Sequence, residues 1–165
     1  MRLMPEHIRL KTASLADVDE FKKIKVLAKQ IKYSGHGEEL AKHLEKNDRQ
    51  VYLIFLKKIP VGCFYLLFEN KKFKEFLPPQ PYAMLLGLSI DKAHQNKGIA
   101  LVAMQKLIDD FKINYADLLL VLSVNCNNIP AQRLYQKVGF IDAGKLYYGG
   151  KAGPQHVYYI NTKNS

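Results

Sequence analysis

The order of apolar and polar positions along the chain predicts that strands and helices alternate. Short runs with alternate or continuous apolar residues are typical of strands, and longer stretches with an apolar residue every three or four positions are typical of helices. We expect strands over residues 7–11, 51–56, 61–68, 84–90, 116–124, 140–147 and 155–161. We expect helices over residues 14–31, 38–46, 98–111 and 128–138. The length of 165 residues suits a single domain spanning residues 1–165 with one core.

The middle of the chain has the pattern of a strand–helix–strand unit. Residues 84–90 and 116–124 are apolar at nearly every position, as expected when both faces of a sheet are covered. The helix between them carries one apolar stripe, formed by Leu101, Met104, Ile108 and Phe111. Two strands joined by a helix in this way are predicted to lie parallel in the sheet.

The loop Gln95-Asn96-Lys97-Gly98-Ile99-Ala100 connects the first of these strands to the helix. A helix N-terminus presents unpaired backbone N–H groups and the positive end of the helix dipole. Gly98 has no Cβ, so a ligand can approach its backbone closely. The loop therefore predicts an anion site, most naturally for phosphate or pyrophosphate. It lacks the Lys-Ser/Thr pair of nucleoside-triphosphate loops and the G-x-G-x-x-G of dinucleotide folds.

A second group of residues lies on the next predicted helix. Asn128, Ala131 and Tyr135 are spaced at i, i+3 and i+7, so they share one face. An amide and a phenol on that face could both reach a ligand lying along the sheet. Alternatively, Asn128 caps the helix and Tyr135 is a half-buried aromatic residue with its hydroxyl in water.

Together, the Gln95–Ala100 loop and the downstream residues resemble the GNAT superfamily of N-acetyltransferases, which bind acetyl-CoA through a Q/R-x-x-G-x-G/A loop. The downstream residues that carry this resemblance are Val124, Asn128, Ala131, Leu134, Tyr135, Gly139 and Phe140. The resemblance implies an α/β (mixed α+β) fold with a central mixed, mostly antiparallel sheet. That sheet would splay between its fourth and fifth strands, with about four flanking helices, and acetyl-CoA would lie in the gap.

The resemblance also implies roles for individual residues. Leu88, Ser89 and Ile90 would contact the acetyl and pantetheine portion through their main chain, and Gln95 opens the pyrophosphate loop. Asn128 would hydrogen-bond the cofactor, and Tyr135 would protonate the departing CoA thiolate. The remaining residues expected to bind the cofactor are Asn96, Lys97, Gly98, Ile99, Ala100, Leu101, Ala131 and Lys137. No metal is implied.

The chain departs from the family pattern at two places. Ala100 replaces the common second glycine, and a methyl group is tolerable at this helical position. Residues 84–90 contain no Asp or Glu, whereas many relatives place a catalytic Glu on this strand. The general base therefore stays open among several groups, which are Glu69, Glu75, Asp91, His94 and a water held by backbone carbonyls.

The amino-acid composition limits the classes of ligand and partner that we expect. The chain has 25 Lys plus Arg against 15 Asp plus Glu, a formal charge of +10, which favours an anionic ligand such as a nucleotide-like cofactor. The basic residues are scattered, so a nucleic-acid partner is not expected. No apolar run approaches the ~20 residues of a membrane span, and two cysteines do not make a disulfide framework. We expect a cytoplasmic protein with no membrane partner, and a homodimer stays open.

The resemblance implies an acyltransferase that moves an acetyl group from acetyl-CoA to a primary amine by direct attack in a ternary complex. The expected amine is that of a small molecule, polyamine-like or other, although the charge of +10 argues against a highly cationic acceptor. A closed pocket roofed by residues 33–40 and 70–81 would favour a small amine, and a long exposed groove would favour a protein. The alternatives are a protein N-terminal or lysine acetyltransferase and a non-catalytic acyl-CoA- or nucleic-acid-binding domain.

Overall fold

A seven-stranded sheet forms the centre of the part of the chain that the computed structural model describes, residues 3–164. Its spatial order is β1-β2-β3-β4-β5-β7-β6. Only β4 and β5 pair in parallel, and the other neighbours are antiparallel. The strands are β1 (Ile8–Thr12), β2 (Arg49–Leu56), β3 (Ile59–Leu67), β4 (Tyr82–Ile90), β5 (Leu119–Asn125), β6 (Ile141–Tyr147) and β7 (Gln155–Ile160). The predicted mixed, mostly antiparallel sheet is confirmed, while residues 1–2 and 165 of the expected domain lie outside the described residues.

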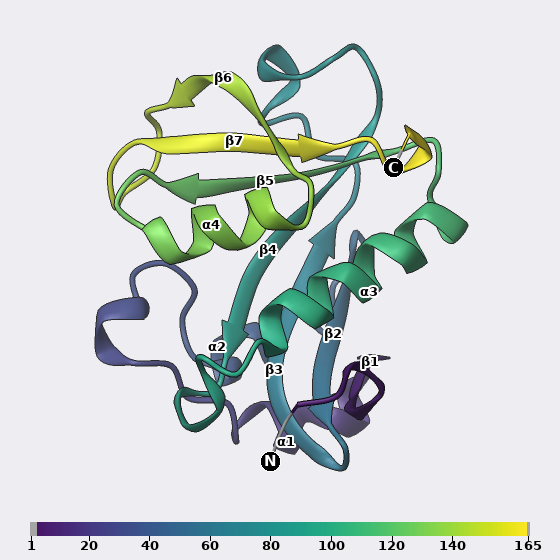
Figure 1. The fold of residues 1–165 in the computed structure, drawn as a ribbon, viewed down its shortest axis with the longest axis vertical. Coiled ribbons are helices and arrows are strands. Elements are labelled where there is room, and N and C mark those ends of the chain that lie inside the picture. Colours follow the sequence, from purple (N-terminus) through teal and green to yellow (C-terminus); the bar gives the residue numbers. More distant parts are fainter. Residues whose placement is uncertain (1–2, 165) are drawn as a thin grey trace.

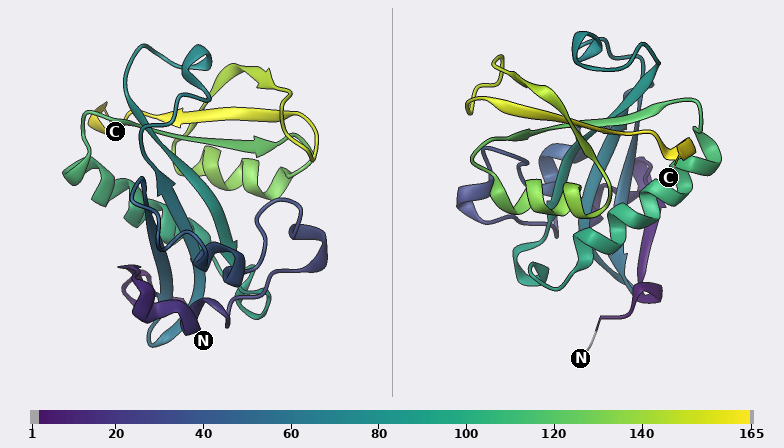
Figure 2. Two further views of the ribbon diagram at one scale, coloured as in Figure 1. Left: turned by 180° about the vertical axis from the view of Figure 1, so that it is seen from behind. Right: turned by 45° about the horizontal axis from the view of Figure 1, so that its top comes forward.

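Four α-helices flank the sheet in residues 3–164. They are α1 (Val18–Phe21), α2 (Gly37–Ala41), α3 (Ile99–Asn114) and α4 (Ile129–Lys137). α3 and α4 cover one face, and α1 and α2 lie on the opposite face (Figures 1 and 2). α3 connects β4 to its parallel neighbour β5, as the pattern of apolar runs predicts.

The prediction of a long helix over residues 14–31 is wrong. Only α1 and two short 3-10 turns, Leu15–Asp17 and Ala28–Gln30, form there. Beyond α1, side chains from distant segments take up the backbone N–H groups that a helix would have used. The N–H of Lys25 donates to Asp91 Oδ1 (2.9 Å), and the N–H of Val26 donates to His36 Nδ1 (3.1 Å). Phe21, Ile24 and Val26 are still buried, whereas Leu15, Leu27 and Ile31 are exposed.

The sheet splays between its fourth and fifth strands, as expected. β4 and β5 pair only where residues Tyr82–Met84 face Leu119–Val121, and then they diverge. β4 carries an extra residue relative to β3, because Leu86 faces Tyr65 while Ser89 faces Cys63. Gly87 lies in this bulge with φ +69°. A bulge bends a strand, and this one lies where β4 leaves its parallel partner.

α3 packs its apolar face on the sheet near β1. Met104, Ile108 and Phe111 are buried there, as their spacing predicts. Leu101, which was expected on the same stripe, is instead partly exposed and faces the opening between the strands. The N-terminal end of α3 is thereby directed to the gap between β4 and β5.

Replacing Gly87 should destabilise the fold. Alanine there would adopt a positive φ, and its Cβ would overlap Leu40 Cδ1 in the present packing. We expect Gly87→Ala to lower the free energy of unfolding by ~1–3 kcal/mol. Gly144→Ala is the matched control, because Gly144 also has a positive φ (+86°) but a Cβ there meets nothing within 4 Å. Denaturant unfolding measures both, and equal losses would show that contact with Leu40 contributes nothing.

Candidate active site

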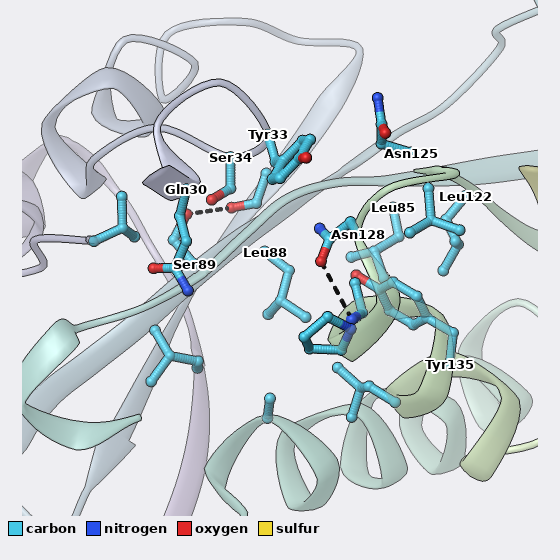
Figure 3. Close-up of a pocket in the computed structure, with 18 of the residues that line it drawn as sticks. Gln30, Tyr33, Ser34, Leu85, Leu88, Ser89, Leu122, Asn125, Asn128 and Tyr135 are labelled. Atoms are coloured by element: carbon cyan, nitrogen blue, oxygen red, sulfur yellow. Dashed lines mark hydrogen bonds between the residues drawn. The ribbon is translucent and has the colours of Figure 1, made fainter. Parts of the chain in front are cut away.

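The divergence of β4 and β5 opens a cavity of about 550 Å³. Its walls come from β4, β5, the start of α3, one face of α4 and the segment 26–34 (Figure 3). Ligand sites in proteins typically have volumes of ~300–1,000 Å³. The cavity is therefore large enough to take an elongated organic ligand between the two strands.

The anion site predicted at the start of α3 has the required backbone geometry. Gly98 caps the helix in the left-handed conformation (φ +82°), and Asn96 is also left-handed (φ +62°). The first helical bond runs from the N–H of Val102 to Gly98 O (3.2 Å), so the N–H groups of residues 99–101 have no carbonyl partner within the helix. The nearest atom to a Cβ built on Gly98 would be Leu3 Cδ2 at 3.9 Å, which leaves the approach open.

The side chain of Gln95 holds this loop in place. Its Nε2 donates to Ile90 O (2.8 Å) and to Gln30 Oε1 (2.8 Å), and its Oε1 accepts from Gln30 Nε2 (3.1 Å). The paired amides join the loop to the segment 26–34 on another wall of the cavity. Gln95 thus positions the backbone that faces the cavity.

Tyr135 projects from α4 toward the cavity and is 8% exposed (Figure 3). Its ring packs edge-on against Phe140, with 5.7 Å between centroids. Burial raises the pKa of Tyr135 well above its ordinary value, so the hydroxyl keeps its proton at neutral pH. The hydroxyl makes no hydrogen bond to any described residue, which leaves its proton available to a ligand.

Asn128 caps α4 and also faces the cavity. Its Oδ1 accepts from the N–H of Ala131 (3.4 Å), so it caps α4. The same side chain lines the cavity, and its amide nitrogen is not used in the cap (Figure 3). An N-cap that uses only the amide oxygen leaves an N–H₂ donor for a ligand.

β4 presents its main chain to the cavity. Leu88, Ser89 and Ile90 line the wall beyond the last residue pair with β5. The Ser89 hydroxyl is committed, because it donates to Gly35 O (3.2 Å) and Gly87 O (3.1 Å). Beyond Met84 this edge of β4 pairs with no strand, although Ile90 O accepts from Gln95 Nε2, so an extended ligand could add to it as a strand adds to a sheet edge.

Most of the residues expected to bind the cofactor are brought together at this cavity. Those that line it are Leu88, Ser89, Ile90, Gln95, Asn96, Gly98, Ile99, Ala100, Leu101, Asn128 and Ala131, together with Tyr135. Lys97 and Lys137 are exposed and do not form part of its wall. Lys137 follows Tyr135 by two helical positions, a rotation of about 200°, and therefore faces away. A direct contact of either lysine with a cofactor stays a prediction.

Most of the candidates for the general base do not line the cavity. Glu69, Glu75 and Asp91 do not line it, whereas His94 does, and no Asp or Glu within residues 3–164 forms part of the lining. His94 Nδ1 lies 3.2 Å from Asp91 Oδ2. Burial opposes the ionisation of Asp91, but hydrogen bonds from the Lys25 N–H, His94 and the Ala93 N–H outweigh it and lower its pKa.

Sequence analysis missed part of the cavity wall. Gln30 lines it from a segment that was predicted to be helical. Asn125 lies at the end of β5 and is nearly buried, with its Nδ2 donating to Ala152 O (2.8 Å). In the sequence, Asn125 could have been identified as a polar residue that directly follows an apolar run. Tyr33, Ser34 and Lys72 fall within the two segments that were expected to roof a pocket.

Within residues 3–164 no group of three or more metal-ligating side chains occurs, and no helix has both the length and the apolar character to cross a membrane. Cys63 and Cys126 are both free, and burial raises the pKa of the Cys63 thiol to about 12. The buried Cys63 thiol is therefore unreactive at neutral pH.

Comparison with known proteins gives consistent matches. The model of the acetyltransferase (GNAT) family matches residues 19–140. The uncharacterized N-acetyltransferase YbbJ of Bacillus subtilis (strain 168) is 33% identical over 149 residues, which cover 88% of this chain and 86% of YbbJ.

Two solved structures show the same fold at low identity. The spermidine N-acetyltransferase of Vibrio cholerae in complex with CoA and spermine superposes with a TM-score of 0.68 at 20% identity, covering 94% of this chain and 95% of that one. An acetyltransferase of Salmonella typhimurium that modifies the N-terminal serine of ribosomal protein L7/L12 gives 0.66 at 18% identity, covering 93% and 94%.

Gly98 provides the direct test of the anion site. Gly98→Glu would place bulk and a negative charge where the loop is expected to receive phosphate, and we expect calorimetry to detect no CoA binding. Gly98→Ala is the control for backbone strain: it keeps the positive φ but adds only a methyl group in open space, so affinity should fall by less than that of the Glu variant. Wild-type CoA affinity in Gly98→Glu, with the fold intact by circular dichroism, would remove the loop from the cofactor site.

Proposed function

We propose that this chain, which belongs to the acetyltransferase (GNAT) family, transfers an acetyl group from acetyl-CoA to the primary amine of a small molecule. Attack would be direct, within a ternary complex. The observation that carries the proposal is that one cavity joins the open N-terminus of α3 to the buried hydroxyl of Tyr135. Acetyl-CoA carries a pyrophosphate and a thioester. The N-terminus of α3 would bind the first, and the Tyr135 hydroxyl could donate a proton at the second.

The arrangement of the walls suggests how the donor would lie. Its pyrophosphate would accept hydrogen bonds from the N–H groups of residues 98–101, assisted by the helix dipole. The pantetheine arm would follow the unpaired edge of β4 along residues 88–90, and Asn128 would donate its amide N–H₂. The thioester would then reach the part of the cavity that Tyr135 faces.

The chain's own groups can support each step of acyl transfer. The uncharged amine attacks the thioester carbonyl, forming the C–N bond and an oxyanion. Main-chain N–H groups of β4 beside the Gly87 bulge would stabilise that oxyanion. The attacking nitrogen releases a proton to water; when the C–S bond breaks, the Tyr135 hydroxyl donates its proton to the thiolate and is then reprotonated from water. The high pKa of buried Tyr135 keeps the proton in place until that step, because the hydroxyl stays neutral at physiological pH.

Proton removal from the amine is assigned to water. Among the side chains considered as a base, His94 alone lines the cavity, and it is engaged with Asp91 beside the pyrophosphate loop. An alkylammonium ion has a pKa near ~10 and must lose a proton before it attacks. Because the described cavity lining holds Lys32 and Lys72 and no carboxylate, it disfavours the charged form of the amine. That effect aids release of the proton to water.

The similar proteins do not identify the acceptor of this chain. Proteins of similar fold include one in complex with spermine and one that modifies a ribosomal protein. In this chain the cavity wall includes Tyr33 and Ser34 as well as Lys72, from the two segments expected to roof a pocket for a small amine. An N-terminal amine of a protein is the second candidate, supported by the similarity to the L7/L12-modifying enzyme.

Tyr135→Phe tests the catalytic assignment. The change keeps the ring that packs on Phe140 and removes only the hydroxyl. We expect kcat to fall by ~10- to 10³-fold with little change in acetyl-CoA affinity, because losing a general acid typically costs this much. Thiol release with an amine panel measures the rate.

Tyr158→Phe is the matched control for this experiment. It also removes the hydroxyl of a buried tyrosine, one that accepts a hydrogen bond from Gln136 Nε2 (3.1 Å) outside the cavity. It should change stability and leave kcat unaltered. An unchanged kcat in Tyr135→Phe would show that water, and not Tyr135, protonates the thiolate. A large loss of acetyl-CoA affinity would show that Tyr135 binds the cofactor instead.

A further inference from the structure

The part of the cavity wall that lies outside the two cofactor motifs carries positive charge. Lys32 and Lys72 line this part, and no Asp or Glu among residues 3–164 lines any part of the cavity. The lining segments concerned are 26–34, Lys72 in the loop between β3 and β4, and the chain near Ala152 and Gln155. An acceptor that approaches the acetyl group from this side would lie near the ammonium groups of Lys32 and Lys72.

Lys32 lines the cavity from the segment 26–34. It lies between Gln30 and Tyr33, and Figure 3 shows both of these neighbours across the cavity from Asn128 and Tyr135. Its ammonium nitrogen lies 5.0 Å from the centroid of the Tyr33 ring. Gln30 is held by Gln95, so the segment that carries Lys32 is fixed to the pyrophosphate loop.

Lys72 approaches the cavity from a different element. Its Nζ lies 4.8 Å from the centroid of the Tyr147 ring and 5.4 Å from that of Phe73. Contact with two aromatic faces restricts where the ammonium group can lie. Neither Lys72 nor Lys32 forms an ion pair within residues 3–164, although several other lysines of the chain do. Their charge is therefore not neutralised by the protein.

These positions constrain the chemistry of the acceptor. A polyamine would bring further positive charges to a wall that offers no carboxylate, and like charges repel at short range. An acceptor with a negative group could pair with one or both lysines while its amine faces the thioester. Exposed ion pairs are individually weak, so the resulting preference should be moderate and should depend on salt.

We propose that the acceptor is a primary amine that also bears an anionic group, such as a carboxylate, which pairs with Lys32 and Lys72. This inference rests on the proposed function and specifies its acceptor. It places the selectivity of the enzyme on two side chains that take no part in the acyl-transfer step itself. It also distinguishes this chain from the structural neighbour in complex with spermine.

The experiment compares three amines with the same five-carbon chain and different ends: δ-aminovalerate, pentylamine and cadaverine. Thiol release from acetyl-CoA gives kcat/KM for each at low salt and at 0.5 M salt. We expect δ-aminovalerate to exceed pentylamine by ~3- to 10-fold, and cadaverine to be the poorest, in line with one or two partly exposed ion pairs. The differences should shrink at high salt.

The double variant Lys32→Gln, Lys72→Gln should remove this order, chiefly by raising KM for δ-aminovalerate. Lys29→Gln, Lys71→Gln is the matched control: it makes the same change in net charge at exposed neighbours that do not line the cavity, and it should keep the wild-type order. Calorimetry with CoA should give unchanged affinity for both double variants.

The outcomes separate this inference from the proposed function. Acetylation of all three amines with equal efficiency, or a preference for cadaverine, overturns the inference and leaves the acetyltransferase assignment intact. A raised KM for acetyl-CoA in the Lys32, Lys72 variant with an unchanged order of amines also overturns it, because the lysines would then serve the phosphates of CoA. Failure to acetylate any amine, despite CoA binding, contradicts the proposed function and the inference together.

Discussion

The early end of pairing between β4 and β5 is the constraint on which the site depends. The two strands face each other over only three residue pairs before they separate. A parallel pair of ordinary length would fill the gap with backbone hydrogen bonds and leave no room for a ligand. The bulge at Gly87 bends β4 at this point and requires a backbone conformation that favours glycine. A local feature of one strand thus creates the cavity.

Polar contacts between distant segments hold the walls of that cavity. The paired amides of Gln30 and Gln95 join the segment 26–34 to the loop before α3. The Ser89 hydroxyl reaches Gly35 O from β4, and Asn125 reaches Ala152 O from β5. These bonds bring together parts of the chain that are 27 to 65 residues apart. A site held in this way is largely formed before its ligand arrives, which reduces the entropy lost on binding.

Much of the fold could be predicted from the sequence because its strands and its two long helices have strong local patterns. α3 and α4 are capped by Gly98 and Asn128 and bury most of the residues that their spacing indicates. The helix expected over residues 14–31 failed because Asp91 and His36 take its backbone N–H groups, and no local pattern reveals such long-range partners. Helical propensity is a weak preference that tertiary contacts override.

The residues of the site also divide into those with a local sequence pattern and those placed by long-range contacts. Residues in the two motifs, such as Gly98 and Tyr135, were predicted because a motif is contiguous or regularly spaced, and the structure brings them to one cavity. Gln30 could not be identified, because its place in the wall depends on contacts across the fold, and Asn125 was indicated only by its position directly after an apolar run. Lys97 was predicted from its neighbourhood in the sequence alone, and the structure leaves its side chain outside the wall.

A crystal structure of the protein with CoA tests the central claim most directly. The account predicts that the pyrophosphate accepts hydrogen bonds of ~2.7–3.2 Å from the N–H groups of residues 98–101. It also predicts that the pantetheine arm lies between β4 and β5, with its sulfur facing the Tyr135 hydroxyl. CoA bound elsewhere on the protein, or bound in the cavity with its sulfur directed away from Tyr135, would contradict the account.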